Sequence, residues 1–298
     1  MASDIAAEAA HDPSPGRRLR QAIEDTTIAV PGAPFALTGR LIESAGFGAA
    51  YVSGAAFSAG SLSVVDEGLF TLTELAEHVR RLTSAVTIPV IVDADTGFGE
   101  TANVERTIHE LERAGAAAIQ LEDQQLPKKC GHLSGKTLVS PAEMSAKVRA
   151  AAAARRDPGT VIIARTDARG VTDLDDAIAR AHAYLQAGAD WIFPEALTST
   201  DEFARFAEAV DAPLVANMTE FGQSPLLEVD ELADLGYAVV LYPVTLLRVT
   251  LKAMQAALAI LATDGTQSEL LDLMVTREEL YELLKYDEFR RRQEGYGS

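Results

Sequence analysis

The chain has 298 residues, of which 48% are hydrophobic and 23% charged. This composition fits a folded protein with a sizeable core and excludes the disordered and fibrous classes. A formal net charge of −18 would repel a nucleic-acid backbone or an anionic membrane, so neither is expected as a partner. The single cysteine, Cys130, excludes an internal disulfide and a thiolate zinc cluster and favours a reducing compartment.

The N-terminal segment has neither the basic start nor the apolar run of a signal peptide, and no stretch is identified as long enough to span a membrane. We therefore expect a cytoplasmic protein with a disordered tail over residues 1–16. Residues 17–298 are expected to form one catalytic domain with a C-terminal helical extension, because no linker or change in composition marks a second domain.

Eight short apolar runs, rich in Val, Ile and Ala, are expected to form strands, and segments of helical length separate most of them. The runs span residues 34–39, 49–54, 89–95, 117–123, 161–167, 191–196, 213–219 and 238–243. Nearly continuous apolar character and alternation with helices are typical of a parallel sheet covered on both faces. Eight such units predict an α/β fold, a (β/α)8 barrel of the TIM type, with an open doubly wound sheet as the alternative.

The segment KKCGHLSGKT, residues 128–137, resembles a phosphate-binding loop because it ends in Gly-Lys-Thr, but Cys130 stands where the first glycine belongs. The sequence SPAE that follows predicts a helix with Ser140 as its N-cap and Pro141 as its first residue. A phosphate loop needs its helix to begin at the Gly-Lys-Thr itself, so that the amides point at the phosphates. We therefore favour a site built around the cysteine over a nucleotide site.

Polar side chains gather at the carboxyl ends of the predicted strands, which is where a (β/α)8 barrel carries its active site. The loops that leave these strand ends converge on one face of the barrel. The polar residues are Ser53, Asp93, Asp95, Glu122, Asp123, Arg165, Asp167, Glu195, Asn217, Thr219 and Tyr242.

Asp93 and Asp95 are two residues apart, so on a strand their side chains leave the same face and can reach one cation together. With Glu122 and Asp123 near the next strand end, the oxygen-rich set indicates Mg²⁺, with Mn²⁺ as a possible substitute. The alternative for Asp95, which precedes a Thr-Gly pair, is that it only makes a turn.

Three arginines are candidates for binding a substrate carboxylate, because a guanidinium group can hold a carboxylate through two parallel hydrogen bonds. Arg165 and Arg248 lie at or just beyond strand ends, and Arg277 lies in the C-terminal segment TREELYE. For Arg277 the pattern by itself favours an exposed helix surface.

Lys128 and Lys129 precede Cys130 directly and would stabilise its thiolate, so the thiol could give up a proton during catalysis. The alternative is a buried structural cysteine. His132 either takes part in the site or faces solvent. The glycines and the proline of residues 127–135 are consistent with a mobile lid.

Eight motifs together resemble the isocitrate lyase superfamily, and within it the branch of 2-methylisocitrate lyases. The resemblance runs from about residue 42 to about residue 289, and the motifs are KKCGH, DADTGFG, LEDQ, IARTDAR, FPEAL, ANMTEFGQSPL, YPVTLLRV and TREELYE. One departure is the segment SVVDEG, which keeps Asp66 but has Val65 where the family usually carries a proline.

The resemblance implies a (β/α)8 barrel that forms a homotetramer, with a C-terminal helix exchanged between subunits. It implies Mg²⁺-dependent cleavage of 2-methylisocitrate, a small tricarboxylate, to pyruvate and succinate, as in the methylcitrate cycle of propionate catabolism. The alternatives within the superfamily are isocitrate, dimethylmalate or oxaloacetate as the substrate. Outside the enzyme class, the alternative is a catalytically silent carboxylate-binding relative.

The resemblance also implies roles for single residues. Asp93 and Asp95 would hold the metal, with Asp66, Glu122 and Asp123 nearby through water. Cys130 would be the acid, Tyr51 the base in preference to a water on the metal, and Arg165 and His132 would complete the catalytic set. Phe193, Leu241 and Pro243 would leave room for the substrate methyl group, where isocitrate lyases carry a tryptophan. The substrate would be bound by Ser53, Gly54, Ala55, Cys130, Gly131, Arg165, Glu195, Asn217, Met218, Thr219, Arg248 and Arg277.

Overall fold

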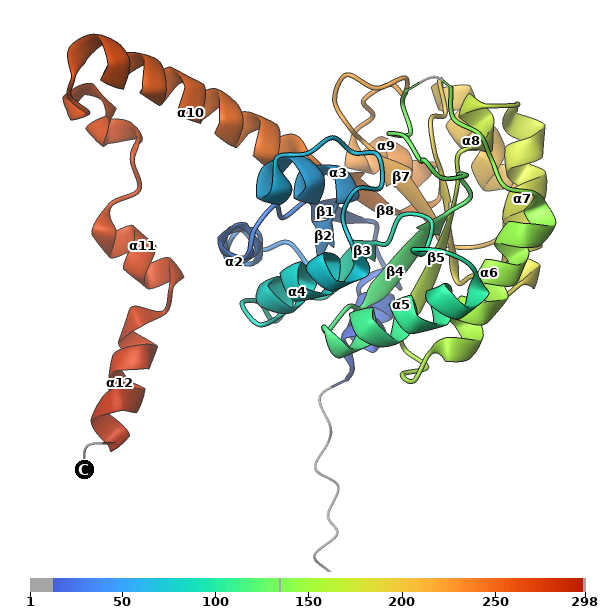
Figure 1. Cartoon of the computed structure of the whole chain (residues 1–298), viewed down its shortest axis with the longest axis horizontal. Helices are drawn as coiled ribbons and strands as arrows, with labels where there is room; N and C mark the ends of the chain where they lie inside the picture. Colours follow the sequence, from blue (N-terminus) through green and yellow to red (C-terminus); the bar gives the residue numbers. More distant parts are fainter. Residues whose placement is uncertain (1–12, 134, 297–298) are drawn as a thin grey trace, which may run out of the picture.

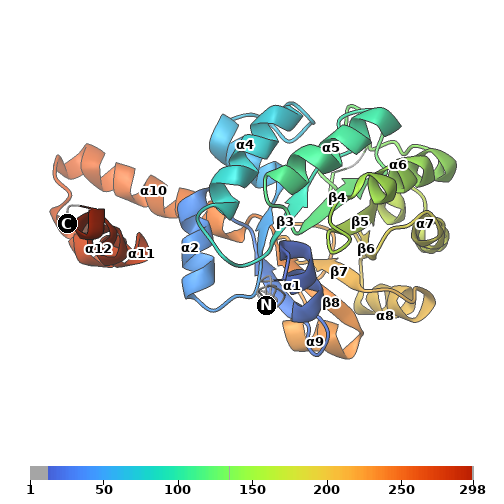
Figure 2. The same cartoon turned by 90° about the horizontal axis from the view of Figure 1, so that it is seen from below.

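The computed structural model describes residues 13–133 and 135–296 and contains eight parallel strands that curl into a barrel surrounded by helices (Figures 1 and 2). The sheet has the order β1-β8-β7-β6-β5-β4-β3-β2. Its two ends meet at a parallel bridge between Gly32 and Tyr51, beside which the Ala33 amide donates to the Tyr51 carbonyl at 2.8 Å. The predicted (β/α)8 barrel is therefore confirmed. The strands are β1 Ile28–Pro31, β2 Ala50–Val52, β3 Val90–Asp93, β4 Ala118–Glu122, β5 Val161–Thr166, β6 Trp191–Pro194, β7 Leu214–Asn217 and β8 Tyr237–Tyr242.

Helices follow each strand and cover the outside of the barrel, as Figure 2 shows most clearly. Short 3-10 or π-helical turns extend several of the connections. The α-helices are α1 Pro15–Ala22, α2 Ala36–Ser44, α3 Gly54–Phe57, α4 Leu72–Thr83, α5 Thr101–Arg113, α6 Pro141–Ala154, α7 Leu174–Gln186, α8 Thr200–Ala209, α9 Val229–Asp234, α10 Thr245–Asp264, α11 Arg277–Leu283 and α12 Tyr286–Tyr296. The short turns are η1 Ser58–Leu62, η2 Ala168–Gly170 and η3 Ser268–Leu273.

Two apolar clusters hold the barrel together, as expected for strands covered on both faces. The inner cluster fills the barrel with side chains that include Trp191 and Phe193, and Leu19 of α1 joins it. The outer cluster packs the strands against the surrounding helices and includes Phe203 and Phe206 of α8. A filled interior leaves the carboxyl ends of the strands as the place where a cavity can form.

The first predicted strand, residues 34–39, is wrong. The strand lies earlier, at Ile28–Pro31, and most of the predicted run belongs to helix α2, Ala36–Ser44. The run is apolar because its residues supply the buried face of a helix, where Thr38 and Ile42 are buried. A short apolar run does not distinguish these two cases by itself. Six of the other seven runs contain one strand each, and the run 238–243 covers all of β8 except its first residue, Tyr237.

The loop between β4 and α6 carries the cysteine motif. It ends at the predicted helix start, since α6 begins at Pro141 and the Ser140 hydroxyl accepts a hydrogen bond from the Glu143 amide at 3.2 Å. An antiparallel bridge between Gln124 and Leu138 closes the base of the loop. The loop is therefore a short hairpin that begins and ends beside the barrel mouth.

Helices α10 to α12 form an arm that extends away from the barrel (Figure 1). Large apolar side chains on the arm are exposed, among them Leu258 at 63% and Leu273 at 82%. The expectation that no stretch is long enough to span a membrane is wrong for α10, which has 20 residues and contains an 18-residue window with a mean hydropathy of 1.4. This concerns length and composition only, and Arg248 and Lys252 lie within the helix.

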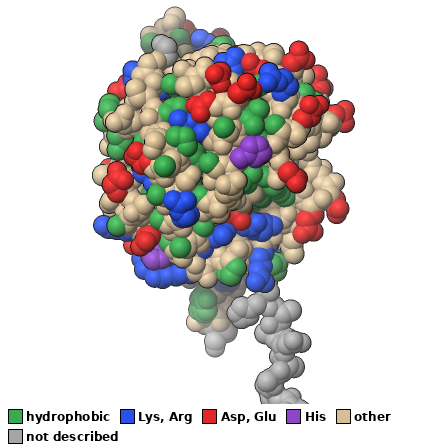
Figure 3. Space-filling view, turned by 90° about the vertical axis from the view of Figure 1, so that its right-hand side faces the viewer, with side chains coloured by type: hydrophobic (Ala, Val, Ile, Leu, Met, Phe, Trp, Pro, Cys, Tyr) green, Lys and Arg blue, Asp and Glu red, His purple; other side chains and the backbone are tan. Residues whose placement is uncertain are grey.

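The predicted tail over residues 1–16 lies mostly outside the described residues, and helix α1 begins at Pro15. On the face of the barrel that carries α7 and α8, acidic and basic side chains are interspersed (Figure 3). This face presents no continuous basic surface of the kind that binds nucleic acid.

Candidate active site

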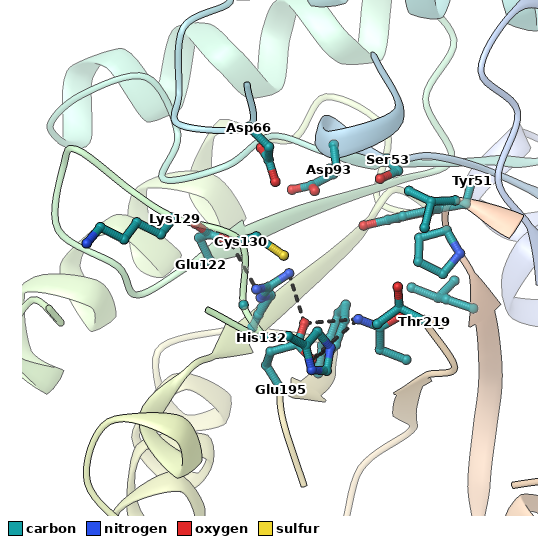
Figure 4. Close-up of a pocket in the computed structure, with 18 of the residues that line it drawn as sticks. Tyr51, Ser53, Asp66, Asp93, Glu122, Lys129, Cys130, His132, Glu195 and Thr219 are labelled. Carbon is teal, nitrogen blue, oxygen red and sulfur yellow. Dashed lines mark hydrogen bonds and ion pairs between the residues drawn. The ribbon is translucent and has the colours of Figure 1, made fainter. Parts of the chain in front are cut away.

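A cavity lies at the carboxyl ends of the strands, beneath the loop between β4 and α6. It brings together most of the site residues predicted from the sequence, and Figure 4 shows how several of them converge. The lining residues are Tyr51, Ser53, Ala55, Asp66, Asp93, Glu122, Lys128, Lys129, Cys130, Gly131, His132, Arg165, Phe193, Glu195, Asn217, Thr219, Leu241, Pro243, Val244 and Arg248. The predicted residues outside this lining are Gly54, Asp95, Asp123, Asp167, Met218, Tyr242 and Arg277.

Asp93, the last residue of β3, is held rigidly by three hydrogen bonds. Its Oδ2 accepts from the Gly54 amide at 3.2 Å, and its Oδ1 accepts from the Asp95 amide at 3.2 Å and from Gln120 Nε2 at 3.1 Å. Asp95 has a φ of 47°, a left-handed conformation that a residue other than glycine adopts at a cost of roughly 1–3 kcal/mol. Strained backbone of this kind is concentrated at functional sites.

Lys128 lies between two of these acids. Its buried ammonium group pairs with Asp66 and lies 2.8 Å from Asp95 Oδ1. Lys129 points away from the cavity (Figure 4). Lys128 is engaged by carboxylates and Lys129 is directed outward, and the stabilisation of a Cys130 thiolate by these two lysines stays a prediction.

Asp66, Asp93, Asp95 and Glu122 form an acidic cluster, and its four carboxylates outnumber the two cations that pair with them, Lys128 and Arg165. Asp95 Oδ2 and Glu122 Oε1 are buried and accept no hydrogen bond from any residue that the structure describes. Burial raises the pKa of Asp95 to about 7 although Lys128 opposes it, and burial raises the pKa of Glu122 although Arg165 opposes it. Free carboxylate oxygens are the ligands that Mg²⁺ prefers. Within residues 13–133 and 135–296, however, no group of three or more His, Cys, Asp or Glu side chains is arranged to hold a metal ion.

Asp123 does not belong to this cluster, contrary to the prediction. Its Oδ2 accepts from Tyr184 Oη at 2.7 Å and from Thr166 Oγ1 at 2.8 Å, and its Oδ1 accepts from the Asp167 amide at 2.9 Å. Arg180 lies 3.3 Å from the same carboxylate. Both oxygens of Asp123 are thus engaged in hydrogen bonds between the barrel and α7. Successive residues of a strand point to opposite faces, so Asp123 points outward while the neighbouring Glu122 points into the barrel.

Arg165 is fixed in the floor of the cavity mainly by Asp167 and Glu195, and a third carboxylate, that of Glu122, lies 3.5 Å from its Nε. Its Nη1 lies 3.1 Å from Glu195 Oε2, and its Nε and Nη2 donate to Asp167 at 3.0 and 3.1 Å. The guanidinium group lies over the Phe193 ring at 5.2 Å, and Asn217 Nδ2 donates to Glu195 at 3.0 Å. A positive charge held this firmly can bind a substrate carboxylate without reorganising.

His132 connects the cysteine loop to the segment that follows β7. Its Nδ1 accepts from the Gln223 amide at 3.0 Å, which places the ring proton of the neutral imidazole on Nε2. That nitrogen lies 3.0 Å from Glu195 Oε1. Burial alone would raise the pKa of Glu195, but Arg165 and His132 hold it well below its ordinary value. Glu195 is therefore a permanent carboxylate shared by two predicted catalytic residues.

Cys130 is a free, half-buried thiol, and its sulfur is directed into the cavity (Figure 4). Gly131, directly beside it, lines the same cavity. The position fits a group that gives a proton to a bound substrate, and it differs from that of a structural cysteine in a closed core.

The surroundings of Tyr51 favour a neutral phenol over the phenolate that a base would need. Its hydroxyl donates to Gln120 Oε1 at 3.0 Å. Burial is the largest cause that raises its pKa well above the ordinary value, and the charge of Asp93 adds to it. Tyr51 is therefore placed to donate a hydrogen bond.

Four other predicted substrate-binding residues have contacts of a different kind. The amide of Gly54 holds Asp93, and Met218 Sδ accepts from the Leu227 amide at 3.3 Å within the outer core. Arg248 lines the cavity, where Glu220 pairs with it at 2.7 Å. Arg277 is exposed on α11 and lies outside the cavity of its own chain.

Sequence reasoning missed Gln120 and Lys136 as residues that support the site. Gln120 joins Tyr51 to Asp93, and its position two residues before Glu122 on one strand was the available signal. Lys136 belonged to the apparent phosphate loop, and its buried contact with Asp167 at 2.9 Å could not be read from that motif.

The fold and the site together define a class of protein, the (β/α)8-barrel enzymes that act on small carboxylates at an acidic cluster beside a buried arginine. A family model of phosphoenolpyruvate phosphomutase matches residues 19–262. The chain is 54% identical over 279 residues to a 2-methylisocitrate lyase of Aeropyrum pernix, covering 93% of this chain and 90% of that relative.

Two solved structures extend the comparison. A 2,3-dimethylmalate lyase of the PEP mutase/isocitrate lyase superfamily has a TM-score of 0.90 at 33% identity, covering 96% of this chain and 97% of the other. A phosphonopyruvate hydrolase in complex with oxalate and Mg²⁺ has a TM-score of 0.87 at 31% identity, covering 96% and 100% of the two chains. The chain belongs to the PEP mutase/isocitrate lyase superfamily and, within it, to the 2-methylisocitrate lyase family. The resemblance found in the motifs is confirmed.

Proposed function

We propose that the protein is a cytoplasmic, Mg²⁺-dependent carbon–carbon lyase that cleaves 2-methylisocitrate to pyruvate and succinate, the lyase step of propionate catabolism. The observation that carries this proposal is one cavity that combines free carboxylate oxygens, the fixed Arg165–Glu195 pair and the Cys130 thiol. The name of the relative from Aeropyrum pernix supports the choice of substrate.

We assign the metal to Asp93 and Asp95, with Asp66 and Glu122 beside it. The unpartnered oxygens of Asp95 and Glu122 support this assignment, and the related phosphonopyruvate hydrolase was solved with Mg²⁺. When bound, Mg²⁺ would act as a Lewis acid on the oxygen atoms of the forming keto acid. Asp123 is left out because hydrogen bonds within the barrel wall occupy both of its oxygens.

Side chains of the protein carry out the proton transfers and stabilise the negative charge that forms during cleavage. Cleavage of the carbon–carbon bond leaves an electron pair on the carbon that becomes a methylene group of succinate. In our proposal the free carboxylate oxygen of Glu122 accepts the proton of the substrate hydroxyl as that oxygen becomes the keto oxygen of pyruvate. The Cys130 S–H bond breaks, its proton forms the new C–H bond of succinate, and a thiolate remains. Arg165 holds a substrate carboxylate near this carbon and stabilises the negative charge. Tyr51 keeps its proton and serves as a hydrogen-bond donor.

The apolar side of the cavity supports a substrate that carries an extra methyl group. Phe193, Leu241 and Pro243 all line the cavity, as the prediction of a roomier pocket required. A methyl-sized space changes transition-state binding by about 1–3 kcal/mol. The proposal therefore includes a preference for 2-methylisocitrate over isocitrate.

We also propose that the protein is a homotetramer in which a second copy covers the arm of helices α10 to α12. The exposed apolar side chains of the arm support this, with Val275 exposed at 68% and Leu273 at 82%. In this arrangement Arg277 of one protomer would complete the cavity of its partner. Light scattering coupled to size-exclusion chromatography tests the proposal, and a monomer at micromolar concentration would contradict it.

The purified protein should be assayed with Mg²⁺ for pyruvate release from 2-methylisocitrate, and from isocitrate and dimethylmalate in parallel for their keto-acid products. Oxaloacetate should be tested by release of oxalate. We expect the highest kcat/KM for 2-methylisocitrate. A higher kcat/KM for any other substrate would show that the protein has a different activity of the superfamily. If none of the four substrates is turned over, the protein is better described as a catalytically silent carboxylate-binding relative.

A further inference from the structure

The loop that carries Cys130 is held on both sides of the cysteine by side chains of the loop itself. On one side, the Gln124 amide group donates to the Lys129 carbonyl and accepts from the Lys129 amide, both at 2.9 Å. On the other side, the Lys136 ammonium group donates to the Gly131 carbonyl. The backbone next to Cys130 is therefore fixed in both directions along the chain.

Lys136 also connects the loop to the residue that orients Arg165. Its side chain is 1% exposed, and its Nζ lies 2.9 Å from Asp167 Oδ1. The same carboxylate accepts two hydrogen bonds from Arg165. Burial raises the pKa of Asp167, but Arg165 and Lys136 outweigh this effect and hold it below its ordinary value. Asp167 is thus a fixed negative charge shared by two cations.

The residues around the contact between Lys136 and Asp167 are closely packed. A Cβ atom added at Gly131 would lie 2.3 Å from Arg165 Nη2 and 2.6 Å from Glu195 Cγ, so the loop backbone rests directly on the catalytic arginine. A Cβ atom added at Gly170 would lie 3.1 Å from Lys136 Nζ. Small residues at both positions allow the ammonium group and the loop to approach the barrel end this closely.

We propose that Lys136 is a positioning residue for the reaction, because its ammonium group joins the Gly131 carbonyl to Asp167 and so sets where Cys130 stands relative to Arg165. The expected effect of Lys136 on turnover rests on the proposed function. The expected effect of Lys136 on the position of the Cys130 thiol does not depend on the substrate. The positioning role and the proposed function can therefore be rejected independently of each other.

The position of the thiol is tested by the rate at which iodoacetamide alkylates Cys130 in the absence of substrate, followed by mass spectrometry. The chain has only one cysteine, so the signal is unambiguous. In Lys136→Met the loop loses a charged anchor, and we expect alkylation to become about tenfold faster or more. We expect kcat to fall by about tenfold to a hundredfold, with a smaller change in KM.

Lys147→Met is the matched control. Lys147 is also a buried lysine, and its Nζ donates to a backbone carbonyl, that of Thr96 at 3.3 Å, outside the cysteine loop. This variant loses a buried ammonium group but should keep the alkylation rate of the wild type. A second test uses Lys136→Ala, in which added ethylammonium should slow alkylation and restore part of the activity.

A folded Lys136→Met variant with wild-type alkylation and kcat would overturn the proposal and leave Lys136 with a structural role only. Faster alkylation without any activity of the wild type on the proposed substrates would support the positioning role and reject the proposed function. If Lys136→Met does not fold, Lys136→Gln decides in its place. The shorter, uncharged side chain cannot join the Gly131 carbonyl to Asp167 as the ammonium group does, so alkylation should again become faster, and an unchanged rate would overturn the proposal.

Discussion

Lys128 Nζ lies 2.8 Å from Asp95 Oδ1, so an ammonium group stands among the carboxylates that we assign to Mg²⁺. It also pairs with Asp66. Arg165 Nε lies 3.5 Å from Glu122 Oε2, but these two cations do not satisfy all four carboxylates, since Asp95 Oδ2 and Glu122 Oε1 remain buried without a partner in the described part of the chain. A divalent cation would supply the missing charge and would have to compete with Lys128 for Asp95.

Removal of the metal should therefore abolish activity. We expect thorough chelation to stop turnover and Mg²⁺ to restore it better than Zn²⁺, because only oxygen ligands are available at the cluster. Calorimetric titration with Mg²⁺ measures binding directly, and Asp95→Asn should lose most of it. Asp123→Asn is the matched control and should keep it, since Asp123 faces the barrel wall. Full activity after chelation would contradict the assignment.

Replacement of Cys130 by serine should separate binding from chemistry. A hydroxyl group is a much weaker acid than a thiol, so we expect kcat to fall by about a hundredfold to ten-thousandfold. The dissociation constant of a substrate analogue, measured by calorimetry, should change little because the cavity keeps its shape. Turnover of Cys130→Ser at close to the wild-type rate would show that the thiol is not the acid.

The size of the side chain at position 193 should control the choice between the two isocitrates. Phe193 lines the cavity beneath Arg165, and Phe193→Trp would crowd the space for the methyl group. We expect the preference for 2-methylisocitrate, roughly 10- to 200-fold in kcat/KM for the wild type, to shrink in the variant. A variant that keeps its full selectivity would place the discriminating contact elsewhere.

The barrel could be predicted from the sequence because its strands are buried on both faces. Seven of the eight apolar runs could therefore be recognised as strands without knowing which other strands they pair with. The exception is the first unit, where the four-residue strand Ile28–Pro31 precedes a helix whose buried face is just as apolar. Periodicity over so few residues does not separate a strand from the start of a helix.

The site could be predicted where a motif fixes which way a side chain points, as for Asp93, Arg165 and Glu195. The site could not be predicted where the role of a side chain depends on a contact with a residue that is distant in the sequence. Asp123 follows Glu122 and so takes the opposite face of β4, where Tyr184 and Thr166 of other segments bind it. Contacts between segments far apart in the chain leave no local signal in a single sequence.

The stability of the protein should fall below neutral pH through His78. Burial, with Arg81 adding to it, lowers the pKa of His78 to about 4 in the folded state, whereas the unfolded chain titrates near 6.5. Between these values the unfolded state binds more protons, so stability is fully present above about pH 6.5 and decreases as the pH falls toward 4. His78→Gln should remove about 2 kcal/mol of the loss between pH 7 and pH 5.

Urea unfolding of the wild type and of His78→Gln at pH 7 and at pH 5 measures this difference. Other titrating groups are common to both proteins and cancel in the comparison. Equal losses of the free energy of unfolding in the two proteins would show that His78 is not the group that titrates.

The central claim is that one cavity, with Mg²⁺, Arg165 and Cys130, cleaves 2-methylisocitrate between two carbon atoms. The most direct measurement follows the wild-type protein and 2-methylisocitrate by proton NMR with Mg²⁺ present and after chelation. We predict that pyruvate and succinate form in equal amounts, only when Mg²⁺ is present, and that Cys130→Ser under the same conditions forms them far more slowly. Unchanged substrate after prolonged incubation with Mg²⁺, or products in any ratio other than one to one, would contradict the account.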